Sequence, residues 1–142
     1  MRQAKKRRVY QRLFCVPATP LAPEGGGWRF EEGVLHVNLK ETPGLAEPDT
    51  ALRFESEALP DRILVLHGTD GTFHAYSNHC ACGGFRVDPV PAEQKIRCCT
   101  LMQSTYDLNG KFLKGTAKKD LTLYAVSVEG DNLSVRVGRI GT

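Results

Sequence analysis

The chain has 142 residues, of which 41% are hydrophobic and 25% are charged, a composition typical of ordinary globular domains. No apolar run approaches the roughly 18 residues that a membrane-spanning helix needs, and no secretory signal follows the basic N-terminus. These features exclude a transmembrane helix, and we expect a single domain, residues 1–142, located in the cytoplasm.

The formal net charge of +3 is concentrated in a basic N-terminal arm, residues 1–13, which holds six basic residues and no acidic one. Without them the chain has 13 basic and 16 acidic residues, a net charge of −3. Such an arm is either a solvated tail or a docking element for an acidic partner, anionic lipid or nucleic acid. Because basic and aromatic residues are not interleaved elsewhere, we do not expect nucleic-acid binding. The six residues are Arg2, Lys5, Lys6, Arg7, Arg8 and Arg12.

The first third of the chain predicts little regular structure. Residues 1–33 contain several prolines and the run Gly25–Gly27, which break any long element. A loose alternation of apolar and polar residues predicts a strand over 34–39. A proline-containing loop is expected over 40–51, followed by a short strand at 51–54.

The middle of the chain has clearer strand signals. An apolar run predicts a strand over 63–67, and Asp70-Gly71 predicts a hairpin whose returning strand covers 73–76. Residues 88–91, Asp-Pro-Val-Pro, are expected to form a turn or loop. Alternation predicts a further strand over 95–98.

The last third continues the same pattern. Asn109-Gly110 predicts a second hairpin over 106–113. Well-alternating segments predict strands over 121–128 and 133–137, and no amphipathic helix or internal repeat is evident. Several short strands separated by turn signals favour an all-β, antiparallel sandwich or barrel.

Four of the five cysteines lie within a window of 20 residues, in two segments that are expected to be loops. The first segment is 78–84, Asn-His-Cys-Ala-Cys-Gly-Gly, and the second is 97–102, Arg-Cys-Cys-Thr-Leu-Met. In a chain without an export signal, clustered cysteines indicate a metal site before they indicate disulfides. Four thiolates suit a [2Fe–2S] cluster or a structural zinc ion. The isolated Cys15 is expected to be a small buried hydrophobic residue.

Residues from about 63 to 137 resemble a Rieske iron–sulfur domain, which carries a Cys-x-His loop and then a Cys-x-x-His loop. Cys80-Ala81-Cys82 and Cys99-Thr100-Leu101-Met102 stand at these two positions, with sixteen residues between Cys82 and Cys99. Further matches after the second loop are Ser104, Tyr106, Asp107, Gly110, Gly115 and Ala117. The resemblance implies a Rieske-type antiparallel β fold with a small cluster-binding subdomain at about 76–111.

The chain departs from the family at both ligand histidines, because Cys82 stands in place of the first and Met102 in place of the second. In the family, the residues that match Ser104 and Tyr106 hydrogen-bond a bridging sulfide and a ligand sulfur. Their presence, and the replacement of both histidines by sulfur-bearing residues, favour altered coordination over a site that has decayed.

The resemblance implies Cys80, Cys82 and Cys99 as ligands and leaves the fourth ligand open. Cys98 is the nearest further thiol, but neighbouring residues of an extended strand point to opposite faces. Met102, His79 or solvent are the alternatives.

Replacing neutral imidazoles by thiolates adds negative charge to the cluster and predicts a low, pH-insensitive potential. Rieske centres span roughly −150 to +300 mV, whereas all-cysteine plant-type clusters lie near about −400 mV.

The functional hypothesis is an electron carrier whose redox partner docks at the two cysteine loops, with the arm as a further contact. No nucleophile–base pair, paired carboxylates or phosphate-binding loop suggests a catalytic site, so we do not expect an enzyme. The alternatives are a cluster-free Rieske-like interaction module, a structural zinc domain or a thiol-based sensor.

Overall fold

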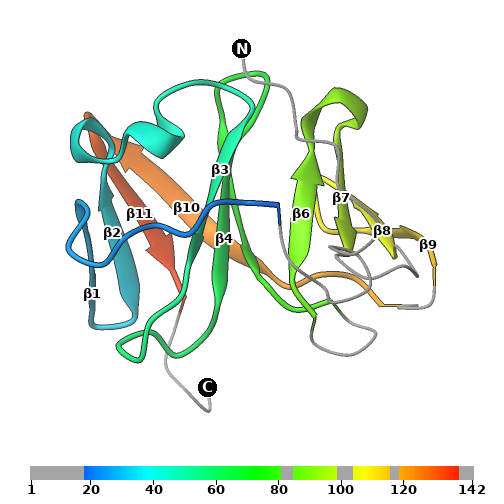
Figure 1. The fold of residues 1–142 in the computed structure, drawn as a ribbon, viewed down its shortest axis with the longest axis horizontal. Coiled ribbons are helices and arrows are strands. Elements are labelled where there is room, and N and C mark those ends of the chain that lie inside the picture. Colours follow the sequence, from blue (N-terminus) through cyan, green and yellow to red (C-terminus); the bar gives the residue numbers. More distant parts are fainter. Residues whose placement is uncertain (1–17, 81–84, 99–103, 116–118, 138–142) are drawn as a thin grey trace.

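The computed structural model describes residues 18–80, 85–98, 104–115 and 119–137, which form two antiparallel sheets (Figure 1). The seven-stranded sheet has the order β1-β2-β11-β10-β5-β4-β3, and the four-stranded sheet has the order β6-β7-β8-β9. The strands are β1 (Trp28–Glu31), β2 (Val34–Asn38), β3 (Thr50–Phe54), β4 (Ile63–His67), β5 (Phe73–Ser77), β6 (Val87–Val90), β7 (Lys95–Cys98), β8 (Thr105–Asp107), β9 (Phe112–Lys114), β10 (Leu123–Glu129) and β11 (Asn132–Arg136).

The described helices are single 3₁₀ turns: η1 (Leu39–Glu41), η2 (Pro43–Leu45) and η3 (Pro91–Glu93). No helix among the described residues is long and apolar enough to cross a membrane. The predicted all-β antiparallel fold is therefore confirmed.

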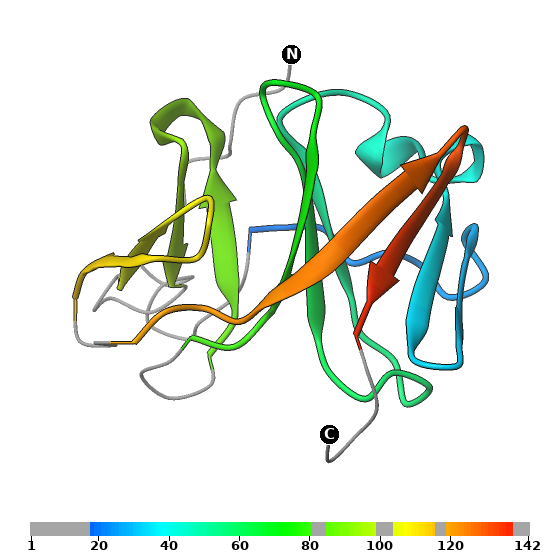
Figure 2. The same cartoon turned by 180° about the vertical axis from the view of Figure 1, so that it is seen from behind.

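Strand β10 joins the two halves of the large sheet (Figure 2). Its first residues, Leu123 and Tyr124, pair with β5, whereas Ala125–Glu129 pair with β11. Side chains from both halves meet in one core, which the structure builds from β2 and β11 on one side and β3, β4 and β5 on the other. The sheet therefore folds over this core like a sandwich. Its fully buried members include Leu35, Val37, Phe54, Ile63, Val65, Leu133 and Val135.

A second core lies between the two sheets and contains two of the predicted site cysteines. Strand β4 contributes to both cores, because Ile63 and Val65 face the first one and Leu64 and Leu66 face the second. This double burial explains the uninterrupted apolar run in the sequence of β4. The buried members of the second core are Leu64, Leu66, Tyr76, Cys80, Val87, Ile96, Cys98, Tyr106 and Leu121.

The expectation of a turn or loop at 88–91 is wrong, because Val87–Val90 form strand β6 at the edge of the small sheet. Val87 donates its backbone N–H to the Asn78 side chain, away from β7. In an antiparallel pair the backbone groups alternate between inward and outward, so the nitrogen of Pro89 also faces outward. Proline costs no ladder hydrogen bond at such an edge position.

Residues 18–31 pack onto the rest of the fold and include a short strand, β1, in a region where the sequence predicted none. Ala18 and Thr19 donate their backbone N–H groups to the Asp88 carboxylate on β6, both at 3.0 Å. Leu21 forms a parallel bridge with Arg53 on β3. The segment that begins at residue 18 therefore contacts both sheets, at β6 in the small sheet and at β3 in the large one.

Candidate metal centre

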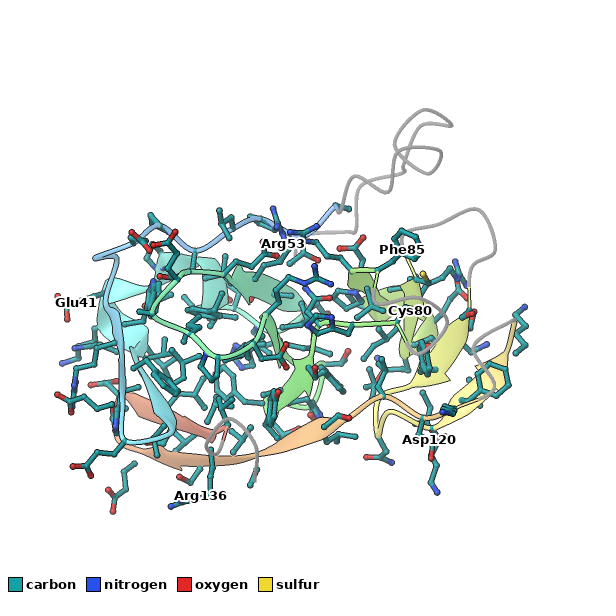
Figure 3. The ribbon with its side chains drawn as sticks, turned by 90° about the horizontal axis from the view of Figure 1, so that it is seen from below. Glu41, Arg53, Cys80, Phe85, Asp120 and Arg136 are labelled. Carbon is teal, nitrogen blue, oxygen red and sulfur yellow. The ribbon has the colours of Figure 1, made fainter. Side chains whose placement is uncertain are left out.

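Cys80 follows β5 and is buried in the second core (Figure 3). Its Sγ lies 3.4 Å from the hydroxyl of Tyr106, a fully buried residue of β8. The backbone N–H of Cys80 donates to the carbonyl of Phe85 at 2.5 Å, which closes the first cysteine loop. The Tyr106 hydroxyl is thus placed to donate to a thiolate at Cys80.

Cys98 is the last residue of β7 and is buried in the same core as Cys80. Burial alternates along β7, so Ile96 and Cys98 share the buried face. Cys98 pairs with Val87, whose N–H faces away from β7, and the side chains of such a non-hydrogen-bonded pair lie close together.

Ser104, at the other end of the second cysteine segment, is fully buried and accepts the Cys98 N–H at 2.8 Å. Gly115 lies directly against it, because a Cβ at Gly115 would lie 2.5 Å from the Ser104 Cα. The φ of +115° at Gly115 also favours glycine.

The β3–β4 connection holds the beginning of the first cysteine loop. Asp61 accepts hydrogen bonds from Ser77 Oγ at 2.5 Å, from the Tyr124 hydroxyl and from His79 Nε2 at 2.5 Å. Burial raises the pKa of the Asp61 carboxyl, but these donors outweigh it and leave the pKa below its usual value. Burial, with the hydrogen bond to Asp61, raises the pKa of Tyr124 to about 12.

His79 precedes Cys80 and uses both ring nitrogens within this network. Arg62 Nη2 donates to Nδ1 at 3.1 Å, which assigns the ring proton to Nε2 for the bond to Asp61. The structure therefore argues against His79 as the fourth ligand, since neither nitrogen is open to a metal.

The same connection holds the end of the loop through Glu55. Arg86 Nε and Nη2 donate to the two Glu55 oxygens at 2.8 and 2.9 Å, and Arg53 Nη1 adds a bond at 2.8 Å. The hydrogen bond from Arg86, opposed by burial and aided by Arg53, lowers the Glu55 pKa to about 2. These contacts anchor both ends of the loop to the large sheet.

Of the predicted site residues, the structure brings Cys80, Cys98 and Tyr106 into one core and places Ser104 beside Cys98. Cys82, Cys99 and Met102 lie outside the described residues. Within the part that the structure describes, no group of three or more histidine, cysteine, aspartate or glutamate side chains could hold a metal ion.

The described residues nevertheless fit a sulfur-bound metal group. Two thiols are buried in one apolar core, a phenol is placed at one of them, and the Asn78 side-chain nitrogen is buried with no hydrogen-bond partner among the described residues. The sequence indicated no role for Asn78, Asp61 or Glu55, because their partners lie in several different strands and loops and form no recognisable sequence pattern.

No family model matches the chain. A curated relative, the chloroplastic cytochrome b6-f complex iron–sulfur subunit of Volvox carteri, is 30% identical over 123 residues, which is 84% of this chain. The chain spans 58% of that relative's length.

Two solved structures are also similar. The plasma membrane Rieske protein PetC3 of the cyanobacterium Synechocystis PCC 6803 has 29% identity and a TM-score of 0.51, over 60% of this chain and 84% of that one. A chain in the complex of reduced oxygenase and oxidized ferredoxin in carbazole 1,9a-dioxygenase has 16% identity and a TM-score of 0.60. The match covers 77% of this chain and 97% of that one.

The fold, with its two antiparallel sheets and with Cys80 and Cys98 buried in the core between them, is that of a Rieske-type protein. The sequence similarities agree, so the chain carries a Rieske-type domain, as the resemblance of the cysteine loops implied.

Proposed function

We propose that this protein is an electron carrier that holds a [2Fe–2S] cluster with Cys80, Cys82, Cys98 and Cys99. One observation carries the proposal: Cys80 and Cys98 are buried in the same core, with the Tyr106 hydroxyl 3.4 Å from Cys80 Sγ. The similarity to a chloroplastic iron–sulfur subunit and to a cyanobacterial Rieske protein supports it. Met102 remains the alternative to Cys98.

The cluster, when bound, accepts and releases one electron, and thiolate ligation in place of imidazole favours a low potential. The chain's own residues set the conditions for that exchange. Tyr106 donates to a ligand sulfur, and the apolar side chains around Cys80 and Cys98 exclude water. The anchors at Asp61 and Glu55 keep the first loop in place.

We further propose that a redox protein docks at the cysteine loops. Phe85, at the end of the first loop, leaves 45% of its surface exposed although its carbonyl bonds the Cys80 N–H. Exposed aromatic residues are common in interfaces. A solved chain of similar fold comes from a complex of an oxygenase with a ferredoxin, and the curated relative is a subunit of a larger complex.

The test is to count iron, zinc and acid-labile sulfide and to record an absorption spectrum on protein purified without air. We expect two irons and two sulfides per chain with visible charge-transfer bands. Cys80→Ala and Cys98→Ala should lose most of the iron. Cys15→Ala is the matched control, because Cys15 lies far from the other cysteines in sequence, and it should retain the iron.

Three other results would overturn parts of the proposal. Zinc without iron would indicate a structural zinc domain, and a folded chain without metal would indicate an interaction module. Full iron in Cys98→Ala together with loss of iron in Met102→Leu would make Met102 the fourth ligand.

A further inference from the structure

Asn78, two residues before Cys80, is held in place by hydrogen bonds to Arg62 and Val87. It is fully buried. Its backbone N–H donates to the Arg62 carbonyl at 2.8 Å, and its carbonyl accepts from Arg62 Nε and Nη2 at 3.3 and 3.1 Å. Its side-chain Oδ1 accepts the Val87 N–H at 2.7 Å. Three of its four polar groups are therefore satisfied.

The remaining group, Nδ2, is buried and has no hydrogen-bond partner in the part of the chain that the structure describes. The orientation of the amide follows from the bond to Val87, because a backbone N–H requires the oxygen on that side. A buried donor without an acceptor costs about 1–3 kcal/mol, so it calls for an explanation such as a bound group.

The surroundings of Asn78 point to sulfur as that acceptor. The segment from Asn78 to Cys80 runs along the outer edge of β6, joined by the bonds from Val87 N–H to Asn78 and from Cys80 N–H to Phe85. Val87 pairs with Cys98 on its other side, and its side chain lies in the core that holds both thiols.

We infer that the Asn78 side-chain amide donates a hydrogen bond to a sulfur atom of the cluster, either a sulfide or a cysteine thiolate. This inference rests on the proposed function. Asn78 is then a positioning and tuning residue, with a donor that the fold orients before the cluster binds. A donor to sulfur stabilises the more negative, reduced cluster, so it raises the potential.

The direct test uses wild-type protein grown with asparagine labelled with ¹⁵N in the side-chain amide only. The chain has four asparagines, and Asn38, Asn109 and Asn132 are exposed, so Asn78 is the only buried one. After reduction, pulsed EPR should detect a ¹⁵N coupling to the cluster. A loaded, reduced protein without such a coupling would overturn the inference and leave the proposed function intact.

The second test compares midpoint potentials. Asn78→Leu removes the donor without adding charge, and we expect a lower potential and loss of the ¹⁵N coupling. The matched control is His36→Leu, because His36 Nδ1 on β2 is the other buried polar atom without a partner in the described residues. The control should keep the wild-type potential and coupling.

Equal potentials in wild type and Asn78→Leu would contradict the inference, as would an equal shift in His36→Leu. If Asn78→Leu does not fold, the labelled wild-type protein still decides the question. Wild-type protein purified without iron and sulfide would instead overturn the proposed function, and this inference with it.

Discussion

At the scale of single residues, the hydroxyl of Tyr106 on β8 contacts Cys80, one of the proposed cluster ligands. Tyr106→Phe removes the hydroxyl 3.4 Å from Cys80 Sγ and leaves the ring in the core. Because a donor to sulfur stabilises the reduced cluster, we expect a lower midpoint potential, with about 1 kcal/mol lost in the free energy of unfolding.

The control for this variant is Tyr124→Phe, which removes a hydroxyl bonded to Asp61 and not to sulfur. It should lower stability by a similar amount and leave the potential unchanged. An equal change of potential in the two variants would show that the Tyr106 hydroxyl acts only through general stability.

A second residue-scale prediction concerns Gly115, which lies against Ser104. In Gly115→Ala the new Cβ would lie 2.5 Å from the Ser104 Cα, so either the backbone of Ser104 or that of β9 must move. We expect a loss of about 2–3 kcal/mol in unfolding free energy and reduced iron content.

Gly71→Ala is the control that separates the effect of backbone strain on stability from the effect of the contact with Ser104. Gly71 also has a positive φ, +87°, but a Cβ there meets no atom of the described residues within 4 Å. This control should lose only about 1 kcal/mol and keep its iron. Equal losses of unfolding free energy in Gly115→Ala and Gly71→Ala would mean that the close approach to Ser104 does not affect stability.

At the scale of elements, the β3–β4 connection contributes Glu55, whose carboxylate binds Arg86 and Arg53. The Glu55 pKa falls from 4.5 to about 2, so the stability that the carboxylate provides is complete above pH 4.5 and is lost as the pH falls toward 2. Glu55→Gln should therefore cost about 1 kcal/mol at pH 7, and the difference from wild type should shrink between pH 4.5 and 2.

Urea denaturation of the metal-free chain at pH 7, 4 and 2.5 measures this difference without interference from acid-labile sulfide. Glu31→Gln is the control, because Glu31 forms an exposed ion pair with Arg29 at 3.4 Å and should change little at any pH. A difference for Glu55 that stays constant down to pH 2.5 would contradict the assigned cause.

The elements that the sequence predicted well are those with a local signal. Strands β4 and β5 flank an Asp-Gly turn, and β8 and β9 flank an Asn-Gly turn. In both places the strand pattern and the turn residues indicate the same hairpin. Strand β6 was missed because Pro89 and the adjoining Pro91 signal a loop, and only the edge position of Pro89 makes a strand possible there. That position depends on the sheet order, which the local sequence does not reveal.

At the scale of the whole molecule, the site lies where the two sheets meet, and its support comes from distant segments. The spacing of Cys80 and Tyr106 could be predicted by resemblance, and their contact agrees with it. The contact between Thr19 and Asp88 joins residues 69 positions apart, and that between Glu55 and Arg86 joins residues 31 apart. In the sequence these side chains look like solvated loop residues, so nothing indicated that they support the site.

The position of the N-terminal segment gives the basic arm, residues 1–13, a role that can be tested. Asp88 holds Ala18 and Thr19, and its neighbour Val87 pairs with Cys98. The residues between the arm and position 18 span at most about 18 Å. We therefore expect the arm's six positive charges to act on charged reactants that approach the cysteine loops.

Removing residues 1–13 changes the net charge from +3 to −3. Reoxidation of the reduced protein by ferricyanide, an anion, should become slower at low ionic strength, and reoxidation by hexaammineruthenium(III), a cation, should become faster. The two chains should converge near 1 M salt, where the screening length is about 3 Å. If the ratio of the two rates is the same with and without the arm at low salt, its charge does not reach the site, and the docking partner needs no acidic surface to match it.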